Sequence, residues 1–390
     1  MKPNYLPLQK SQCPNFDLLN VPGGAKLLDT PALVIDVDIL QRNIKNMARW
    51  AQGKNIALRP HAKTHKSAAI AKQQLASGAL GICVAKIGEA IRLAEEGVGN
   101  ILITSPIVTD RKIRLLRDLN EKCEHLMVAV DNVEIVKLLD LAFSGGKSLD
   151  VLIDRGMGIG YHNRTGAFTA EAAVELADTI SRCSNLNLRG LQAYSGAVQH
   201  VEAFEERKVI ALEAIDRIRK TRDALLERGH DIEIVTGGGT GSCEFDALSG
   251  VFTELQVGSY VFFDVEYNAV IHGADFPQDL QTALFLQTSV ISANLFGRAT
   301  TDAGFKSFAT DGPLPIIHSG AAEGSRYVFM GDEQGGVIAG EGEAGLAVGD
   351  VVRCVTPHCD PTVNLHDFYH CIRGDMLVDI WPVHSRGQSW

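Results

Sequence analysis

Between Thr30 and Tyr267, short apolar runs alternate with longer stretches in which apolar positions recur at helical spacing. The short runs are typical of buried strands and the longer stretches of amphipathic helices. We expect nine strands, at Ala32–Ile35, Ile56–Leu58, Gly81–Val84, Ile101–Thr104, Leu126–Val130, Val151–Ile153, Leu188–Gln192, Ile232–Val235 and Glu254–Val257. Helical patterns separate most of them, for example Leu40–Ala51, Ile87–Glu96, Glu134–Ala142, Ala170–Ile180 and Phe204–Leu226.

This alternation of strands and helices predicts parallel β-α-β units and therefore an α/β fold. A closed (β/α)8 TIM-type barrel needs one strand fewer than the pattern provides. We expect such a barrel, with the first candidate, Ala32–Ile35, placed elsewhere. An open, doubly wound sheet that uses all the strands is the alternative.

The pattern changes after about Tyr267, where β-like runs follow one another with glycine-rich turns and few helical stretches. These runs are Ala283–Ile291, Thr300–Asp302, Gly336–Ile338, Asp350–Val355 and Met376–Ile380. We predict a barrel domain over residues 30–275 and a β-rich C-terminal domain over residues 276–390. Residues 1–29 are expected to form an extended arm that belongs with the second domain.

Composition excludes several classes of function. The net charge of −10 and the lack of a basic stripe argue against binding to nucleic acid. The eight cysteines show no CxxC spacing, which predicts free thiols in a reducing compartment. The sequence contains no apolar span of membrane length and no leader-like segment, so we expect a cytoplasmic protein that does not bind membranes.

A basic run, Arg59–Lys66, directly follows the expected strand Ile56–Leu58. In barrels, polar residues at the carboxyl ends of strands form the active site. The neighbouring cations are expected to depress the pKa of Lys63, which would prepare its amine to form a Schiff base. The alternative is a solvated basic loop.

Two glycine turns follow the last two expected strands of the barrel. Thr236–Ser242 reads TGGGTGS, which exposes backbone amides and adds the hydroxyl of Thr240, and Gly258–Tyr260 reads GSY. Loops at these places bind phosphate in barrels, although each could also be a simple tight bend. A lysine able to form an imine, together with a phosphate site, indicates pyridoxal phosphate.

Three further stretches carry candidate chemistry. Asp154–Gly166 contains two arginines, either of which could face the pyridine nitrogen of the cofactor. Tyr194 and His200 follow a strand and suit ring packing and acid–base roles, with a core or capping role as the alternative. His358 and Asp360 would share one face of an extended strand and could bind a divalent ion, although a chance surface pair is the alternative.

With these motifs the chain resembles the D-threonine aldolase and 3-hydroxy-D-aspartate aldolase group of alanine-racemase-type pyridoxal-phosphate enzymes. The matching blocks span nearly the whole chain: Arg59–Lys66, Gln192–His200, Thr236–Asp246, Thr253–Tyr260, Asp302–Ser307 and His358–Asp367. The resemblance implies a Schiff base on Lys63 and places His200 near the substrate hydroxyl. It implies cofactor contacts at Arg164, Tyr194, Thr236, Gly238, Gly239, Thr240, Gly258, Ser259 and Tyr260, and a metal, Mn²⁺ or Mg²⁺, on His358 and Asp360.

The implied reaction is the cleavage of a D-β-hydroxy-α-amino acid to glycine and an aldehyde by a homodimer. The related D-serine dehydratases use similar parts for β-elimination but pair His with Cys, whereas this chain has Asp360 after His358. A non-catalytic carrier of pyridoxal phosphate is a further alternative, and the β-rich domain argues against it. Close relatives carry glutamine where Ala85 stands, which leaves the β-substituent open among methyl, phenyl and carboxylate.

Overall fold

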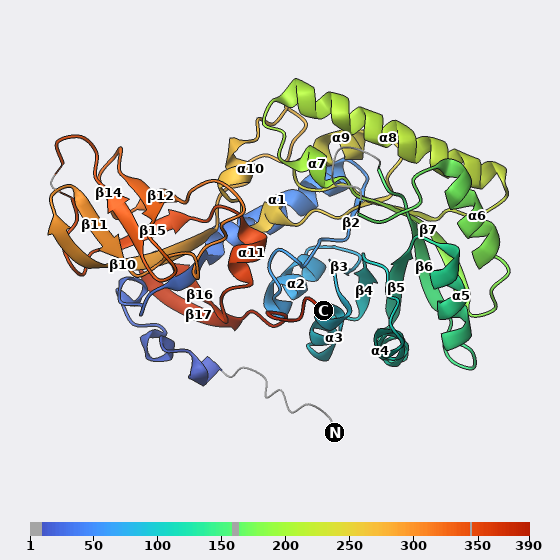
Figure 1. The fold of residues 1–390 in the computed structure, drawn as a ribbon, viewed down its shortest axis with the longest axis horizontal. Helices are drawn as coiled ribbons and strands as arrows, with labels where there is room; N and C mark the ends of the chain where they lie inside the picture. Colours follow the sequence, from blue (N-terminus) through green and yellow to red (C-terminus); the bar gives the residue numbers. More distant parts are fainter. Residues whose placement is uncertain (1–9, 158–163, 344) are drawn as a thin grey trace.

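The computed structural model describes residues 10–157, 164–343 and 345–390. Figure 1 shows a barrel surrounded by helices on one side and a β-rich part on the other. The barrel strands are β2 (Ala57–Leu58), β3 (Ile82–Val84), β4 (Asn100–Ile103), β5 (His125–Val130), β6 (Leu149–Asp154), β7 (Leu186–Ala193), β8 (Ile234–Gly237) and β9 (Glu254–Leu255). The expected strands are therefore confirmed to within a few residues.

These eight parallel strands are hydrogen-bonded in the order β2-β9-β8-β7-β6-β5-β4-β3. The chain after β2 forms a parallel bridge from His61 to Cys83 in β3, which brings the two ends of the sheet together. The barrel prediction is thus confirmed, and the open sheet is not what the chain forms.

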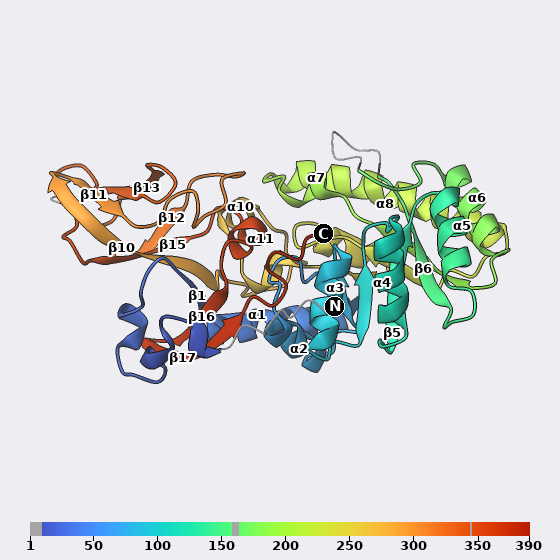
Figure 2. The ribbon, with the colours of Figure 1, turned by 60° about the horizontal axis from the view of Figure 1, so that its bottom comes forward.

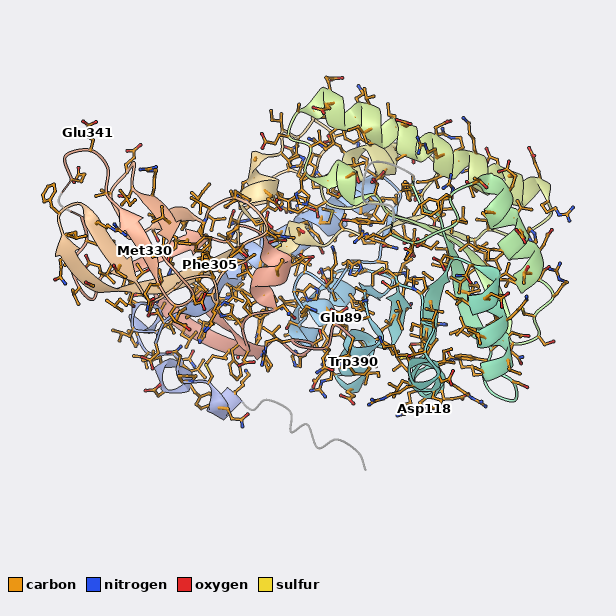
Figure 3. All side chains as sticks on the ribbon, in the orientation of Figure 1. Glu89, Asp118, Phe305, Met330, Glu341 and Trp390 are labelled. Carbon is orange, nitrogen blue, oxygen red and sulfur yellow. The ribbon has the colours of Figure 1, made fainter. Side chains whose placement is uncertain are left out.

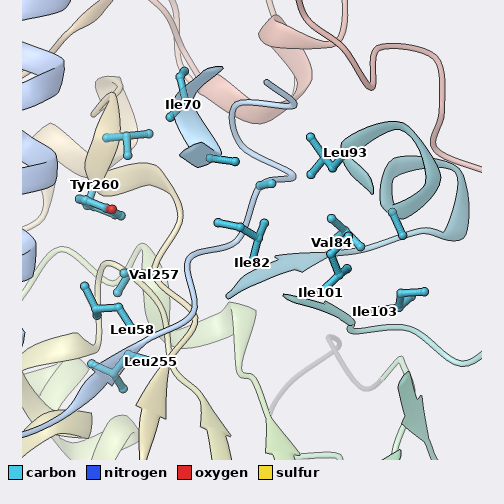
Figure 4. Packing of buried hydrophobic residues seen from close by; sticks show 14 of the residues in the cluster. Leu58, Ile70, Ile82, Val84, Leu93, Ile101, Ile103, Leu255, Val257 and Tyr260 are labelled. Atoms are coloured by element: carbon cyan, nitrogen blue, oxygen red, sulfur yellow. The ribbon is translucent and has the colours of Figure 1, made fainter. Parts of the chain in front are cut away.

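The strands are apolar on both faces because both faces are covered. Val84, Ile101 and Leu255 pack in the main core, part of which Figure 4 shows. Leu102 and Leu152, which point to the opposite face of their strands, belong to a separate buried cluster. Each fully buried side chain of this size contributes about 1.5–3 kcal/mol through the hydrophobic effect.

Helices cover the outside of the barrel, and the longest of them, α8, runs along its upper edge in Figure 1. They are α1 (Val37–Gly53), α2 (Ala68–Ala76), α3 (Ile87–Glu95), α4 (Asp110–Asn120), α5 (Val133–Ala142), α6 (Ala170–Ile180), α8 (Phe204–Glu227) and the short α7 (Gly196–Gln199), α9 (Cys243–Leu248) and α10 (Val265–Ala269). Asp36 caps α1 by accepting from two backbone amides at its start. Short 3-10 turns are η1 (Lys10–Gln12), η2 (Phe16–Leu18), η3 (Gly24–Lys26) and η5 (Ser259–Val261).

Within the described residues, the second sheet has nine strands, in the order β13-β14-β11-β10-β1-β16-β17, with β15 paired to β10 and β12. They are β1 (Ala32–Asp36), β10 (Leu284–Leu295), β11 (Arg298–Thr301), β12 (Ile316–Ser319), β13 (Arg326–Phe329), β14 (Gly335–Ile338), β15 (Val351–Val355), β16 (Phe368–Arg373) and β17 (Met376–Pro382). The first expected strand does lie outside the barrel, because β1 pairs with β10 and β16. The division at residues 275/276 stays a prediction.

Helix α11 (Cys359–Val363) lies between the second sheet and the barrel in Figures 1 and 2. The Cys359 amide donates to Asp264 Oδ2 at 2.8 Å, and Tyr369 Oη donates to the carbonyl oxygen of His65 at 2.6 Å. The C-terminal tail contacts the same region, because the Ser385 amide donates to the carbonyl oxygen of Lys66. Figure 3 shows Trp390, the last residue, on the same side of the barrel as Glu89 of α3. The β-rich part and the C-terminal tail therefore both contact the barrel at the loop that carries Lys63.

All eight cysteines lie in the described part of the chain and are free thiols, as expected. Among the described residues, no helix combines the length and apolar character that crossing a membrane requires.

Candidate active site

Lys63 lies in the loop after β2, where its amine meets the second domain. Lys63 Nζ is 3.2 Å from Asp360 Oδ2, and this carboxylate is the main reason why the pKa of Lys63 is raised. The predicted depression of that pKa was therefore wrong. The neighbouring imidazoles are not cations: burial lowers the pKa of His61 well below its usual value and that of His65 to about 4.

Tyr194 and Arg164 lie beside the Lys63 amine. Lys63 Nζ is 5.7 Å from the centroid of the Tyr194 ring, and Arg164 Cζ is 5.9 Å from the same centroid. Arg155 is buried, with its guanidinium donating to Thr221 Oγ1 at 2.8 Å and to the carbonyl oxygen of Ala167 at 3.1 Å. Of the two arginines, Arg164 is the one beside the lysine, whereas residues 158–163 of this stretch lie outside the described residues.

The glycine-rich turn follows β8, as expected, but its amides are less open than predicted. The amide of Gly239 donates to Ser242 Oγ at 3.2 Å, and the amide of Gly241 donates to Gln199 Oε1 at 3.0 Å. A Cβ on Gly239 would lie 2.4 Å from Gln199 Oε1, and one on Gly238, whose φ is +64°, would lie 2.3 Å from Asp246 Oδ2. Close packing against the protein therefore requires these glycines.

The two glycine turns meet at Thr240. The Tyr260 amide donates to Thr240 Oγ1 at 3.1 Å, so the hydroxyl hydrogen of Thr240 can donate to another group. The Tyr260 hydroxyl accepts from Gln74 Nε2 at 3.0 Å and lies in the core, and Thr236 Oγ1 accepts from Gln256 at 3.2 Å. Gly258 packs against the lysine loop, as a Cβ there would lie 2.7 Å from Thr64 Oγ1, and Ser259 next to it is buried.

His358 and Asp360 are close together, although they do not occupy an extended strand. His358 is the residue before α11 and Asp360 lies in the first turn of that helix, so the predicted strand geometry was wrong. Burial disfavours the charge on Asp360, but the attraction of Lys63 and His358 outweighs burial and lowers the pKa of Asp360. Burial likewise opposes the charge on His358, but Asp360 and Asp311 outweigh it and raise its pKa. Among the described residues, no group of three or more His, Cys, Asp or Glu side chains could hold a metal.

His200 follows α7 and faces the same space. Its ring centroid is 4.6 Å from that of Tyr267 and 6.3 Å from that of His358, and its Nδ1 is 3.7 Å from Glu266 Oε2. Burial, and then the neighbouring His358, lower the pKa of His200 to about 4. The imidazole is therefore neutral near pH ~7 and can accept a proton.

Two carboxylates of this site were not anticipated from the sequence. Asp311 Oδ2 is 2.9 Å from His358 Nδ1, and Glu266 lies beside His200. Neither residue belongs to a motif, and each reaches the site from a loop or a short helix far from its partner in sequence. Only the folded chain brings them together.

The residues present fit pyridoxal phosphate. The cofactor needs an amine for its carbonyl carbon, a surface for its ring and donors for its phosphate. Lys63 and the ring of Tyr194 lie together and offer the first two features, and the hydroxyl of Thr240, where the two glycine turns meet, offers the third. Together with the β-rich second part, this barrel and site define the class of two-part barrel proteins built to hold that cofactor.

Comparison with known proteins identifies the family. The alanine racemase N-terminal domain matches residues 35–266, and a serine dehydratase domain matches residues 283–372. A 3-hydroxy-D-aspartate aldolase of Paracoccus denitrificans (strain Pd 1222) is 36% identical over 96% of this chain and 97% of its own. The crystal structure of a D-threonine aldolase from Filomicrobium marinum is 38% identical, with a TM-score of 0.89 over 95% of this chain and 98% of its own.

A D-threo-3-hydroxyaspartate dehydratase of Delftia sp. (strain HT23) is less similar, at 27% identity over 91% of this chain and 97% of its own. The chain belongs to the alanine-racemase-type family, in the group that contains the D-threonine and 3-hydroxy-D-aspartate aldolases.

Proposed function

We propose that this protein is a lyase that cleaves D-β-hydroxy-α-amino acids of the D-threonine type to glycine and an aldehyde, using pyridoxal phosphate and a divalent metal. The observation that carries the proposal is the approach of Asp360 Oδ2 to within 3.2 Å of Lys63 Nζ. This distance supports the proposal because Asp360, one of the two expected metal ligands, lies directly beside the amine expected to hold the cofactor.

Ten residues would hold the cofactor: Lys63, Arg164, Tyr194, Thr236, Gly238, Gly239, Thr240, Gly258, Ser259 and Tyr260. Lys63 would bind it covalently, Tyr194 would support its ring, and the two glycine turns would hold its phosphate. Arg164 carries a permanent charge and would keep the pyridine nitrogen unprotonated. When bound, pyridoxal phosphate supplies a ring that accepts the electrons left by the broken Cα–Cβ bond.

His358 and Asp360 would hold the metal, Mn²⁺ or Mg²⁺. One imidazole and one carboxylate suit an ion that keeps several water ligands. When bound, the ion supplies a positive charge that favours the loss of a proton from a nearby hydroxyl.

His200 would take the proton of the substrate β-hydroxyl. Its imidazole is neutral near pH ~7 because burial lowers its pKa to about 4, so a ring nitrogen can accept that proton. Glu266 Oε2 lies 3.7 Å from Nδ1, on that side of the ring. Transfer of this proton lets the Cα–Cβ bond break with release of the aldehyde, and a proton delivered to Cα then completes glycine.

The matched serine dehydratase domain favours β-elimination as the second candidate. Product analysis separates the two reactions, with D-threonine and D-3-hydroxyaspartate as substrates before and after EDTA treatment and with Mn²⁺ restored. Glycine plus an aldehyde, dependent on added metal, would support the aldolase. Ammonia plus a keto acid would establish the dehydratase instead, and the rates with the two substrates would reveal the preferred β-substituent.

The Asp360→Ala variant tests the metal role separately. It should abolish cleavage while the cofactor absorbance of the protein remains, because Asp360 is expected to bind the metal and Lys63 the cofactor. Loss of the cofactor from this variant would argue against a metal role for Asp360. A homodimer and a cytoplasmic location belong to the same proposal, and light scattering of the purified protein would test the first of them.

A further inference from the structure

Asp311 lies in the loop between β11 and β12 and contacts His358 directly. His358 Nδ1 and Asp311 Oδ2 are 2.9 Å apart. The Asp311 side chain is 54% exposed, whereas that of His358 is 25% exposed. No motif of the sequence includes Asp311, and its position became visible only in the fold.

This contact determines which nitrogen of His358 is available. A carboxylate only accepts hydrogen bonds, so the nitrogen that faces it must carry the hydrogen. In a neutral imidazole the lone pair then lies on the other nitrogen, Nε2. Carboxylate partners of this kind orient histidines that bind metals and strengthen them as ligands.

The loop that carries Asp311 is attached to the helix that begins after His358. The Ala309 amide donates to Thr362 Oγ1 at 3.0 Å, and Thr362 Oγ1 donates in turn to the carbonyl oxygen of His358 at 2.7 Å. His366 Nε2 lies 2.9 Å from the carbonyl oxygen of Ser307 in the same loop. These contacts hold Asp311 at a fixed place relative to His358.

We propose that Asp311 is a positioning residue that orients His358 so that Nε2 faces the metal. The inference rests on the proposed function, since it assumes that His358 binds a divalent ion. Asp311 itself stays outside the set of ligands. The alternative is that Asp311 and His358 form an exposed ion pair that contributes little to stability or to metal binding.

The chain offers a matched control for that alternative. His230 Nε2 is 2.9 Å from Asp178 Oδ1, which is the same kind of contact at the same distance, on the outer side of the barrel. Asp178 accepts from the Arg228 side chain as well. If the loss of any histidine–carboxylate contact weakened Mn²⁺ binding, Asp178→Asn would weaken it as much as a substitution of Asp311 does.

The experiment measures Mn²⁺ affinity of the cofactor-loaded protein from the EPR signal of free Mn²⁺. Asp311→Ala should weaken binding by roughly 10–100-fold. Asp311→Asn keeps an oxygen that accepts from Nδ1, so it should recover part of that loss. His358→Ala should bind Mn²⁺ far more weakly than either variant, and Asp178→Asn should match the wild type. The cofactor absorbance should stay the same in all four variants.

Several results would overturn the inference. An Asp311→Ala variant with wild-type affinity would make the contact incidental, and one as weak as His358→Ala would make Asp311 a ligand. Unfolding of Asp311→Ala would make the residue structural, against its exposed position. The proposed metal site itself fails in a different way, namely if the wild type does not bind Mn²⁺ or if His358→Ala binds it equally well.

Discussion

Asp246 is a buried carboxyl group behind the glycine-rich turn, and its ionisation should limit the stability of the protein. Ser242 Oγ donates to Asp246 Oδ2 at 2.6 Å, while burial raises the pKa of Asp246 from 3.8 to about 7. The same serine hydroxyl accepts from the Gly239 amide and from Gln199 Nε2. A charge on Asp246 would thus appear next to the turn proposed to hold phosphate.

The sign and size of the effect follow from the two pKa values. Between about pH 4 and pH 7 the folded protein keeps a proton on Asp246 that the unfolded chain has released, so stability falls as pH rises. Each pH unit in this window costs about 1.4 kcal/mol, which gives about 4 kcal/mol over the whole window. The loss is absent below about pH 4 and complete above about pH 7.

The Asp246→Asn variant removes this ionisation and keeps a similar shape. We expect its stability relative to the wild type to rise by about 4 kcal/mol between about pH 4 and pH 8, whatever the offset between the two proteins at low pH. Urea unfolding followed by circular dichroism across this range measures the difference. Asp118→Asn, which replaces an exposed carboxylate on α4, controls for the loss of one charge.

A difference between the wild type and Asp246→Asn that does not change with pH would refute this reasoning. A cavity of about 20 Å³ lies beside Asp246 and Ser242. A single water molecule fits in a space of this size and could hydrate the carboxylate. The constant difference would then show that Asp246 is ionised in the folded protein at a pKa near its ordinary value.

Two further substitutions test the packing around the site. In Gly239→Ala the new Cβ would lie 2.4 Å from Gln199 Oε1 and displace a side chain that bonds to the turn at two places, Gly241 and Ser242. Losing two hydrogen bonds costs about 2 kcal/mol, so the free energy of unfolding in urea titrations should fall by about that amount. An unchanged free energy of unfolding would contradict the expected loss of these two bonds. Arg59→Met leaves Glu254 buried without its partner. It should lower the free energy of unfolding by about 3–5 kcal/mol in urea titrations. A change below about 1 kcal/mol would show that the pair is hydrated.

The barrel was predictable because its strands and helices alternate in separate windows of the sequence. The residues at the carboxyl ends of β2, β8 and β9 could be placed at one mouth for the same reason. Several strands of the second sheet could not be found in this way. Ile316–Ser319 is a short edge strand that is largely exposed, and the run FYHCIR of Phe368–Arg373 is buried without a clean alternation of apolar and polar residues.

The charge state of Lys63 shows why the site was harder to predict than the fold. In the sequence, Lys63 stands among basic residues, yet the folded chain neutralises each of them: Arg59 pairs with Glu254, Lys66 pairs with Glu89, and burial keeps His61 and His65 uncharged.

The carboxylates come from β9, α3 and α11, so no window of sequence that contains Lys63 contains its partners. With the local cations compensated, Asp360 has the strongest effect on the Lys63 amine and outweighs the opposing charge of Arg164, so it raises the pKa that the local pattern had suggested would fall. The pKa of the free Lys63 amine is therefore determined by a contact between the barrel and α11, which no stretch of sequence around Lys63 reveals.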